Sequence, residues 1–264
     1  MSEDRSLEQP LHLEREDAVA IITLHNPPAN TWTPESLNQF RHLLDDLNED
    51  DSVRALVIAS ASDKFFSAGA DLKQFADGDA THAASAAKTF GAAFETLTAF
   101  KGVTVAAING WAMGGGLEVA LACDLRVAAE PAIMALPEAR VGLLPCAGGT
   151  QNLTRLVGEG WAKRIILCGE QVNAERALHI GLVEEVVPAG EARTRAVALA
   201  RQSCRQAPGS VQACKTLIQH TRSGDHNSAL MRERDLFVDL FRTEDQQEGV
   251  SAFLEKREPQ WQNR

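Results

Sequence analysis

Two glutamates beside glycine-rich loops are the residues of this sequence best placed for acid–base chemistry. Glu118 follows three consecutive glycines at residues 114–116, and Glu138 precedes a second glycine-rich loop at residues 142–150. The chain between the two glutamates is long enough for a helix, a strand and a turn, so it can bring Glu138 back close to Glu118. Two carboxylates in one pocket can share a proton, because like charges at short range raise one pKa. One could then act as a base and the other as an acid.

The glycine run at residues 114–116 indicates that the backbone bends sharply or approaches another group closely. Each glycine weakens a regular element by about 0.5–1 kcal/mol. The run opens a predicted helix, where free N–H groups and the helix dipole favour negative charge. Such a site can bind an anion, or an oxygen that becomes one during a reaction. A plain strand–loop–helix connection is an equally good interpretation of this stretch alone, and a single glutamate is more often a solvated surface residue.

The elements that must position these residues form an alternating pattern as far as about residue 190. Hydrophobic patterning predicts a hairpin at 11–24 and strands at 53–59, 103–108, 125–129, 131–135 and 182–187. It predicts intervening helices at 34–48, 72–75, 83–100, 150–156, 161–167 and 173–180, with Thr150 as a possible N-cap. Strands that alternate with helices imply right-handed crossovers and a largely parallel sheet.

The chain after residue 190 is predicted to be entirely helical, with helices at about 191–207, 211–222, 228–241 and 244–257. We therefore divide the sequence into a β/α core at residues 1–190 and a helical region at residues 191–264. An apolar face formed by Leu236, Phe237, Leu240 and Phe241 suits either packing within the chain or association between chains.

Composition limits the classes of function. The 264 residues are 44% hydrophobic and 23% charged, with a net charge of −10, which is ordinary for a soluble globular protein. The acidic balance argues against nucleic-acid or anionic-membrane binding. The five cysteines form no C-x-x-C pair, which favours free thiols in a reducing compartment. The polar N-terminus and the lack of an apolar run of about 18 residues favour a cytoplasmic protein. We find neither metal-ligand spacing nor a dinucleotide-binding fingerprint.

Four separated blocks of this sequence together resemble one known family. They are F-F-S-A-G-A-D-L-K at residues 65–73, I-N-G-W-A-M-G-G-G-L-E at 108–118, P-E-A-R-V-G-L-L-P-C-A-G-G-T-Q-N-L at 137–153, and T-E-D-Q-Q-E-G-V-S-A-F-L-E-K-R-E-P at 243–259. In this order they resemble the signatures of the crotonase superfamily, the enoyl-CoA hydratase/isomerase group. The resemblance covers nearly the whole chain. It implies an α/β crotonase (ClpP/crotonase-like) spiral of ββα units, followed by a C-terminal helical region that forms trimers and contacts CoA.

The resemblance also implies roles for particular residues. The backbone N–H groups of Ala70 and Gly115 would form an oxyanion hole for a thioester carbonyl. Glu118 and Glu138 would position and activate a water molecule, and one of them would deliver a proton to the α-carbon. With less support, the resemblance places Ala68, Asp71, Leu72 and Lys73 along the CoA path, and Phe237 and Lys256 on the CoA of a neighbouring subunit. A solvated tail lysine is a nearly equal interpretation of Lys256.

The function implied is an enoyl-CoA hydratase, a lyase of fatty acid metabolism such as β-oxidation. It would add water syn across the 2,3 double bond of a 2-enoyl-CoA, without a metal or redox cofactor, as a homotrimer or dimer of trimers. The alternatives are a Δ3,Δ2-enoyl-CoA isomerase, a hydratase for branched, methylglutaconyl-like chains and, more remotely, an RNA-binding or structural member. Three residues depart from the family's usual pattern: Cys146 in place of a glycine, Asn152 in place of an arginine, and Gly102 in place of a proline. Of these, Cys146 is expected to reshape the acyl pocket.

Overall fold

A six-stranded sheet forms the centre of the molecule in the computed structural model, which describes residues 9–264. The strand order is β1-β2-β4-β7-β9-β12. The strands are β1 (Leu11–Glu16), β2 (Val19–Leu24), β4 (Ala55–Ser60), β7 (Val103–Ile108), β9 (Leu125–Ala129) and β12 (Glu185–Val187). β1 and β2 form an antiparallel hairpin and all the other pairs are parallel. The predicted hairpin and the largely parallel sheet are both confirmed.

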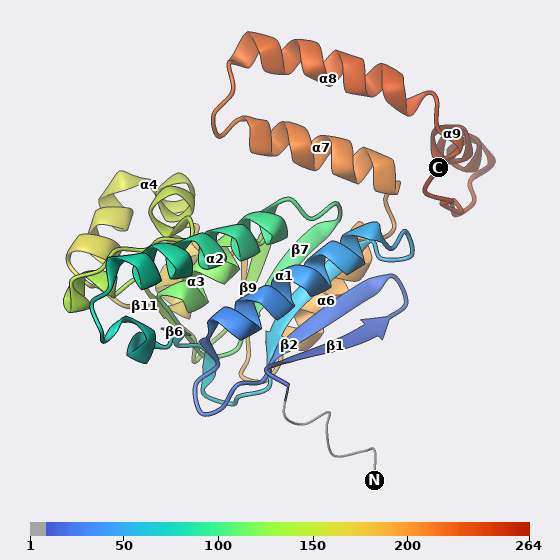
Figure 1. Cartoon of the computed structure of the whole chain (residues 1–264). Helices are drawn as coiled ribbons and strands as arrows, with labels where there is room; N and C mark the ends of the chain where they lie inside the picture. The colour runs from blue at the N-terminus through green and yellow to red at the C-terminus, as the bar shows by residue number, and fades with distance from the viewer. Residues whose placement is uncertain (1–8) are drawn as a thin grey trace.

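Helices cover both faces of this sheet, which explains why its inner strands are mostly apolar on both faces. Alternate residues of each strand point to opposite faces. Ile21 and Val57 belong to a buried cluster with α6 (Ala192–Ser203). Ile22 and Ile58 belong to a second cluster, which includes α1 (Pro34–Glu49) and α2 (Ala80–Thr98). Figure 1 shows α1 and α2 side by side across one face of the sheet.

A second, smaller sheet has the order β11-β10-β8-β5. Its strands are β5 (Phe65–Ser67), β8 (Trp111–Met113), β10 (Ile133–Ala135) and β11 (Val172–Asn173). β5, β8 and β10 run parallel, so their carboxyl ends meet at one edge. A separate pair joins β3 (Thr31–Trp32) to β6 (Gly69–Ala70). The sequence predicts no strand where β8 lies, because three residues are too few to show a strand pattern and β8 depends on pairing with its neighbours.

Apart from α2, the helices between β5 and β12 in the sequence are short or broken. They are the 3-10 helices η2 (Leu72–Phe75) and η3 (Glu138–Val141), and the α-helices α3 (Gly115–Ala122), α4 (Gly149–Leu167) and α5 (Ala174–His179). Inside α4 the backbone of Gly158 leaves the helical region, with φ of 76° and ψ of 164°. The two helices predicted at 150–156 and 161–167 are therefore the two halves of a kinked segment.

The suggestion that Thr150 caps α4 is wrong. The N-cap residue is Gly148, which has a φ of 93° and no side-chain capping bond. The first N–H group of this helix is occupied instead by a carboxylate from α3, since Gly149 donates to Glu118. A capping side chain at this end is therefore replaced by a tertiary contact.

The last helices stand apart from the two sheets. α7 (Pro208–His220) and α8 (His226–Leu240) lie side by side, and α9 (Glu244–Glu255) follows near the C-terminus (Figure 1). Phe237 and Phe241 on α8 leave 62% and 54% of their surfaces exposed. The division at residue 190 stays a proposal, and α6 itself packs on the large sheet. None of the helices in residues 9–264 has the length and apolar character needed to cross a bilayer.

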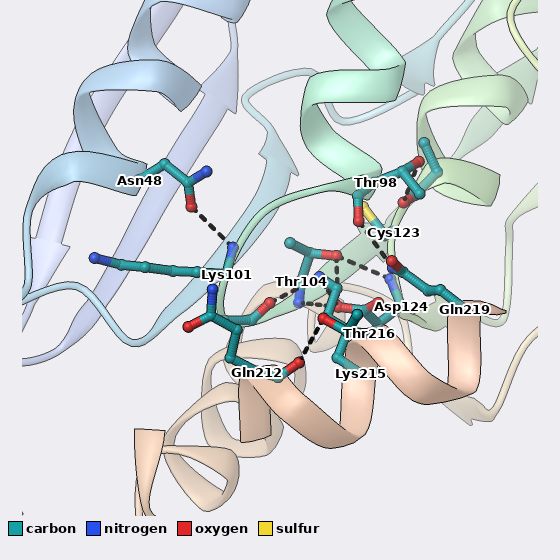
Figure 2. A network of polar contacts seen from close by, with 12 residues as sticks. Asn48, Thr98, Lys101, Thr104, Cys123, Asp124, Gln212, Lys215, Thr216 and Gln219 are labelled. Atoms are coloured by element: carbon teal, nitrogen blue, oxygen red, sulfur yellow. Dashed lines mark hydrogen bonds and ion pairs between the residues drawn. The ribbon is translucent and has the colours of Figure 1, made fainter. Parts of the chain in front are cut away.

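A lysine whose side chain is only 10% exposed attaches α7 to the body of the molecule. The Nζ of Lys215 donates to Oδ2 of Asp124 at 2.7 Å and to the carbonyl of Gly102 at 2.8 Å. One turn further on, the side chain of Gln219 donates to the carbonyl of Thr98. Figure 2 shows Lys215 and Gln219 of α7 beside Asp124, which follows α3, and Thr98 at the end of α2. α7 is thereby linked to the residue that follows α3 by two charges that lie largely out of solvent.

Candidate active site

A cavity of about 490 Å³ opens beside the carboxyl edge of the small sheet. Its lining is mainly apolar, with two carboxylates, one arginine and one thiol. The lining residues are Thr31, Ala68, Ala70, Leu72, Phe75, Phe90, Gly114, Gly115, Glu118, Pro137, Glu138, Arg140, Val141, Leu143, Leu144 and Cys146. An apolar cavity with a few convergent polar groups is the usual form of a small-molecule site.

Three parallel strands deliver the candidate residues to this cavity. The chain leaves β5 into the segment that contains Ala70, β8 into Gly115 and α3, and β10 into Glu138. β8 pairs with both other strands, and Met113 lies opposite Ala135. Residues distant in sequence therefore converge, because the strands before them end at the same edge.

The backbone amides of Ala70 and Gly115 lie close together. An ideal Cβ on Gly115 would stand 3.7 Å from the Ala70 nitrogen. Asp71 donates its N–H to Trp32 of β3, and because N–H groups alternate along a strand, the N–H of Ala70 points to the opposite edge of β6. Gly115 is the first residue of α3, so its N–H has no partner within the helix.

Gly69 allows these two amides to approach each other. Its φ is +89°, and a Cβ there would lie 2.6 Å from the carbonyl oxygen of Met113 and 3.0 Å from the nitrogen of Gly115. Any larger residue would push β6 away from the start of α3.

Glu118 lies in the first turn of α3 with only 3% of its surface exposed. Its Oε1 accepts N–H groups from Ala147 at 2.8 Å and Gly149 at 2.9 Å. Burial raises the pKa of this carboxyl, while the two backbone N–H groups oppose that rise. One oxygen is thus fixed at the start of α4 and the other is available to a ligand.

Glu138 is the first residue of η3, immediately after Pro137. Its carboxyl lies near Gly114, and both residues line the cavity. Its Oε2 is buried and has no hydrogen-bond partner within residues 9–264. Burial, with a smaller contribution from the negative charge of Glu118, raises the pKa of Glu138 to about 7. This carboxyl can therefore carry a proton near neutral pH.

The residues expected along the CoA path divide into two groups. Ala68 and Leu72 line the cavity. Asp71 instead accepts the N–H of Lys73 at 3.1 Å as the N-cap of η2, and Lys73 is exposed beside it; neither residue lines the cavity.

The two residues expected to reach the CoA of a neighbouring subunit lie in the C-terminal helices. Phe237 is on α8, where its ring packs against Phe241 with centroids 5.3 Å apart. Lys256 ends α9 in a left-handed conformation with φ of 56°. Neither residue lines the cavity within this chain, so their expected contact stays a prediction about an assembly.

Sequence reasoning missed the groups that fix Glu118 in place. These are the backbone amides of Ala147 and Gly149, which carry no residue-type signal, although the glycine pair at the start of α4 could have indicated a helix start. Cys146 is exposed on the cavity wall. Partial burial raises the pKa of its thiol to about 11, and the charges of Glu118 and Glu138 add to the rise.

The arrangement can stabilise negative charge on an oxygen and transfer protons beside it. Two adjacent N–H groups suit an oxyanion, and two carboxyls with unequal environments suit an acid–base pair. Among residues 9–264, no group of three or more histidine, cysteine or acidic side chains is arranged as a metal site.

Comparison with known proteins gives consistent matches over almost the entire chain. The family model for enoyl-CoA hydratase/isomerase matches residues 14–264. A probable enoyl-CoA hydratase of Mycobacterium tuberculosis is 38% identical, covering 96% of this chain and 97% of its own. The solved structure of Pseudomonas aeruginosa DspI is 56% identical, with a TM-score of 0.95 and coverage of 99% and 100%. An enoyl-CoA hydratase structure from Bacillus anthracis is 34% identical, with a TM-score of 0.93 and coverage of 97% and 100%.

These matches confirm the crotonase fold that the resemblance implied, a mixed α/β structure with helices at the C-terminus. The chain belongs to the enoyl-CoA hydratase/isomerase family.

Proposed function

We propose that this protein is an enoyl-CoA hydratase that adds water syn across the 2,3 double bond of a 2-enoyl-CoA to give a 3-hydroxyacyl-CoA. One observation carries the proposal: Ala70, Gly115, Glu118 and Glu138 all line one mainly apolar cavity. Burial raises the pKa values of both carboxyls. Membership of the family supports the same chemistry.

In the proposed reaction, the thioester oxygen accepts the N–H groups of Ala70 and Gly115. Attack of water at C3 pushes electrons onto this oxygen and forms an enolate. Both donors are backbone groups held by β6 and α3, so they need little reorganisation when the charge develops. Removal of one such donor typically costs about 2.7–4 kcal/mol of transition-state stabilisation.

The two carboxyls divide the proton transfers between them. Burial raises the pKa of Glu118, but the N–H groups of Ala147 and Gly149 stabilise its charged form, so we assign it as the ionised partner. It accepts a proton from the attacking water as the bond from oxygen to C3 forms. Glu138 is the protonated partner, because its pKa is about 7, and it delivers its proton to C2. The pair holds one proton before and after turnover, and exchange through solvent restores the starting state.

The cavity suits a thioester with an apolar acyl chain. Ala68 and Leu72 line its wall, and exposed Lys73 beside them is proposed to bind a phosphate of CoA as a point charge. In a homotrimer or dimer of trimers, Phe237 and Lys256 of a neighbouring subunit are proposed to contact the same CoA. The exposed phenylalanines of α8 support an association of this kind.

The proposal is tested by mixing the protein with crotonyl-CoA and following the loss of absorbance of the conjugated thioester. The expected product is 3-hydroxybutyryl-CoA, identified by mass spectrometry. Absence of turnover on short, long and branched 2-enoyl-CoA substrates would refute the function. Full activity in both Glu118→Gln and Glu138→Gln would refute the mechanism. Conversion of a 3-enoyl-CoA without hydration of any 2-enoyl-CoA would identify an isomerase instead.

A further inference from the structure

Cys146 lies where the two candidate carboxylates face the cavity. It lines the same cavity as Glu118 and Glu138, and both of their charges act on its thiol. In the proposed reaction, the carboxylates hold the water that attacks C3. The β-carbon of the substrate must therefore lie next to both carboxylates, in the part of the cavity that Cys146 also lines.

The backbone around Cys146 is fixed, so the thiol cannot retreat from the cavity with its loop. On one side, Pro145 is buried and packs close to Gly149. On the other, Ala147 is only 7% exposed and donates its N–H to Glu118. Cys146 has a negative φ, since it is absent from the residues with a left-handed backbone. A side chain at this position is therefore free of backbone strain, and its main effect is to occupy cavity space.

We propose that Cys146 sets the width of the cavity at the β-carbon, and so favours enoyl chains with one substituent on that carbon over chains with two. The inference rests on the proposed hydratase function and extends it to a class of substrate. The thiol acts by its volume. Its pKa of about 11 keeps it protonated near neutral pH, so it is not a reactive nucleophile there.

The expected size of the effect follows from the volume of one methyl group. One extra carbon in an apolar pocket changes discrimination by about 10–200-fold. Replacement of the whole CH2SH side chain by hydrogen in Cys146→Gly frees space for a second β-substituent. The ratio of kcat/KM for 3-methylbut-2-enoyl-CoA to that for crotonyl-CoA should then rise by about 10-fold or more. The ratio is the appropriate measure, because the extra methyl also slows the chemical step intrinsically.

The experiment measures this ratio in the wild type, Cys146→Gly, Cys146→Ala and Cys146→Val. The ratio should increase in the order Val, Cys, Ala, Gly. The Ala variant retains a Cβ, so it separates the effect of volume from the backbone freedom that glycine adds. Cys168→Gly is the matched control, since Cys168 is exposed and does not line the cavity. It should leave the ratio at the wild-type value.

A binding measurement separates this inference from the function on which it rests. Calorimetry would compare butyryl-CoA with 3-methylbutyryl-CoA, saturated analogues that require no turnover. A shift of the binding ratio toward the branched analogue in Cys146→Gly supports the width effect, whether or not any enoyl-CoA is hydrated. Absence of hydration together with such a shift would refute only the proposed function. Hydration of crotonyl-CoA with unchanged ratios in both the Gly and Ala variants would overturn the role of Cys146 and leave the function intact.

Discussion

The proton on Glu138 should control the alkaline side of the pH profile. In the proposed reaction only the enzyme form with Glu138 protonated is active, and the pKa of this group is about 7. The protonated fraction is then about one half at pH 7 and about one hundredth at pH 9, a fall of about 50-fold. The plot of kcat/KM against pH should show this fall, because kcat/KM reports the free enzyme.

The perturbation that tests this assignment is Glu138→Gln. The amide keeps the shape of the side chain but cannot supply the proton, so kcat/KM should fall by about 10²–10⁴-fold at pH 7. The remaining activity should lose its dependence on pH near 7. Glu159→Gln is a suitable control, because Glu159 is an exposed glutamate paired with Lys163, and it should retain the wild-type profile. Substrate hydrolysis without enzyme is subtracted at each pH.

Folding stability gives an independent measurement of the same group. The pKa of Glu138 is higher in the folded protein than the ordinary 4.5. The folded state therefore binds this proton more tightly, and stability is lost as pH rises from about 4.5 through about 7. The shift corresponds to at most about 3 kcal/mol, and partial solvent contact reduces it to about 1–2 kcal/mol. Urea unfolding should show Glu138→Gln gaining this amount over the wild type at pH 8, and almost none at pH 4.5.

Two results would refute this reasoning. The first is a kcat/KM that stays constant between pH 6 and pH 9 in the wild type. The second is an alkaline fall that persists unchanged in Glu138→Gln, since another group would then carry the proton.

The remaining predictions concern backbone position and the attachment of α7. Gly69→Ala should reduce kcat/KM by about 10²–10³-fold by displacing the amide of Gly115. Gly78 also has a positive φ but has open space around it, so Gly78→Ala should leave kcat/KM within about twofold. Equal losses in steady-state assays of the two variants would contradict the proposed role of the amides. Lys215→Ala should destabilise the fold by about 3 kcal/mol in urea unfolding, because it leaves Asp124 largely buried without its partner. The exposed Lys163→Ala should cost less than about 0.5 kcal/mol, and a similar loss in both lysine variants would argue against a special contribution from the buried pair.

The convergence of Glu118 and Glu138 could be predicted from the sequence because residue types and glycine runs mark both of them. The alternation of predicted strands with predicted helices also indicated the largely parallel sheet and the order of the main elements along the chain. The strand β8 could not be predicted, since Trp111–Met113 is too short to show a period. Its conformation comes from pairing with β5 and β10.

The remaining features of the site depend on backbone groups, which a sequence does not mark. Any residue except proline has an N–H, so nothing in the identity of Ala147 indicates that it donates to Glu118. The start of α4 shows the same limit. Thr150 has the chemistry of a capping residue, yet the carboxylate from α3 already accepts the N–H of Gly149. A local preference was overridden by a contact with a residue distant in the sequence.

The bonds from Ala147 and Gly149 to Glu118 restrict how this site can diverge during evolution. The segment that donates these bonds to Glu118 also carries Cys146, so an insertion or deletion there would displace the Glu118 carboxylate along with the cavity wall. Exchange of the side chain at position 146 leaves both backbone bonds in place. Selection can therefore alter substrate range at this position by single point mutations, while the length of the loop is constrained by its hydrogen bonds to Glu118.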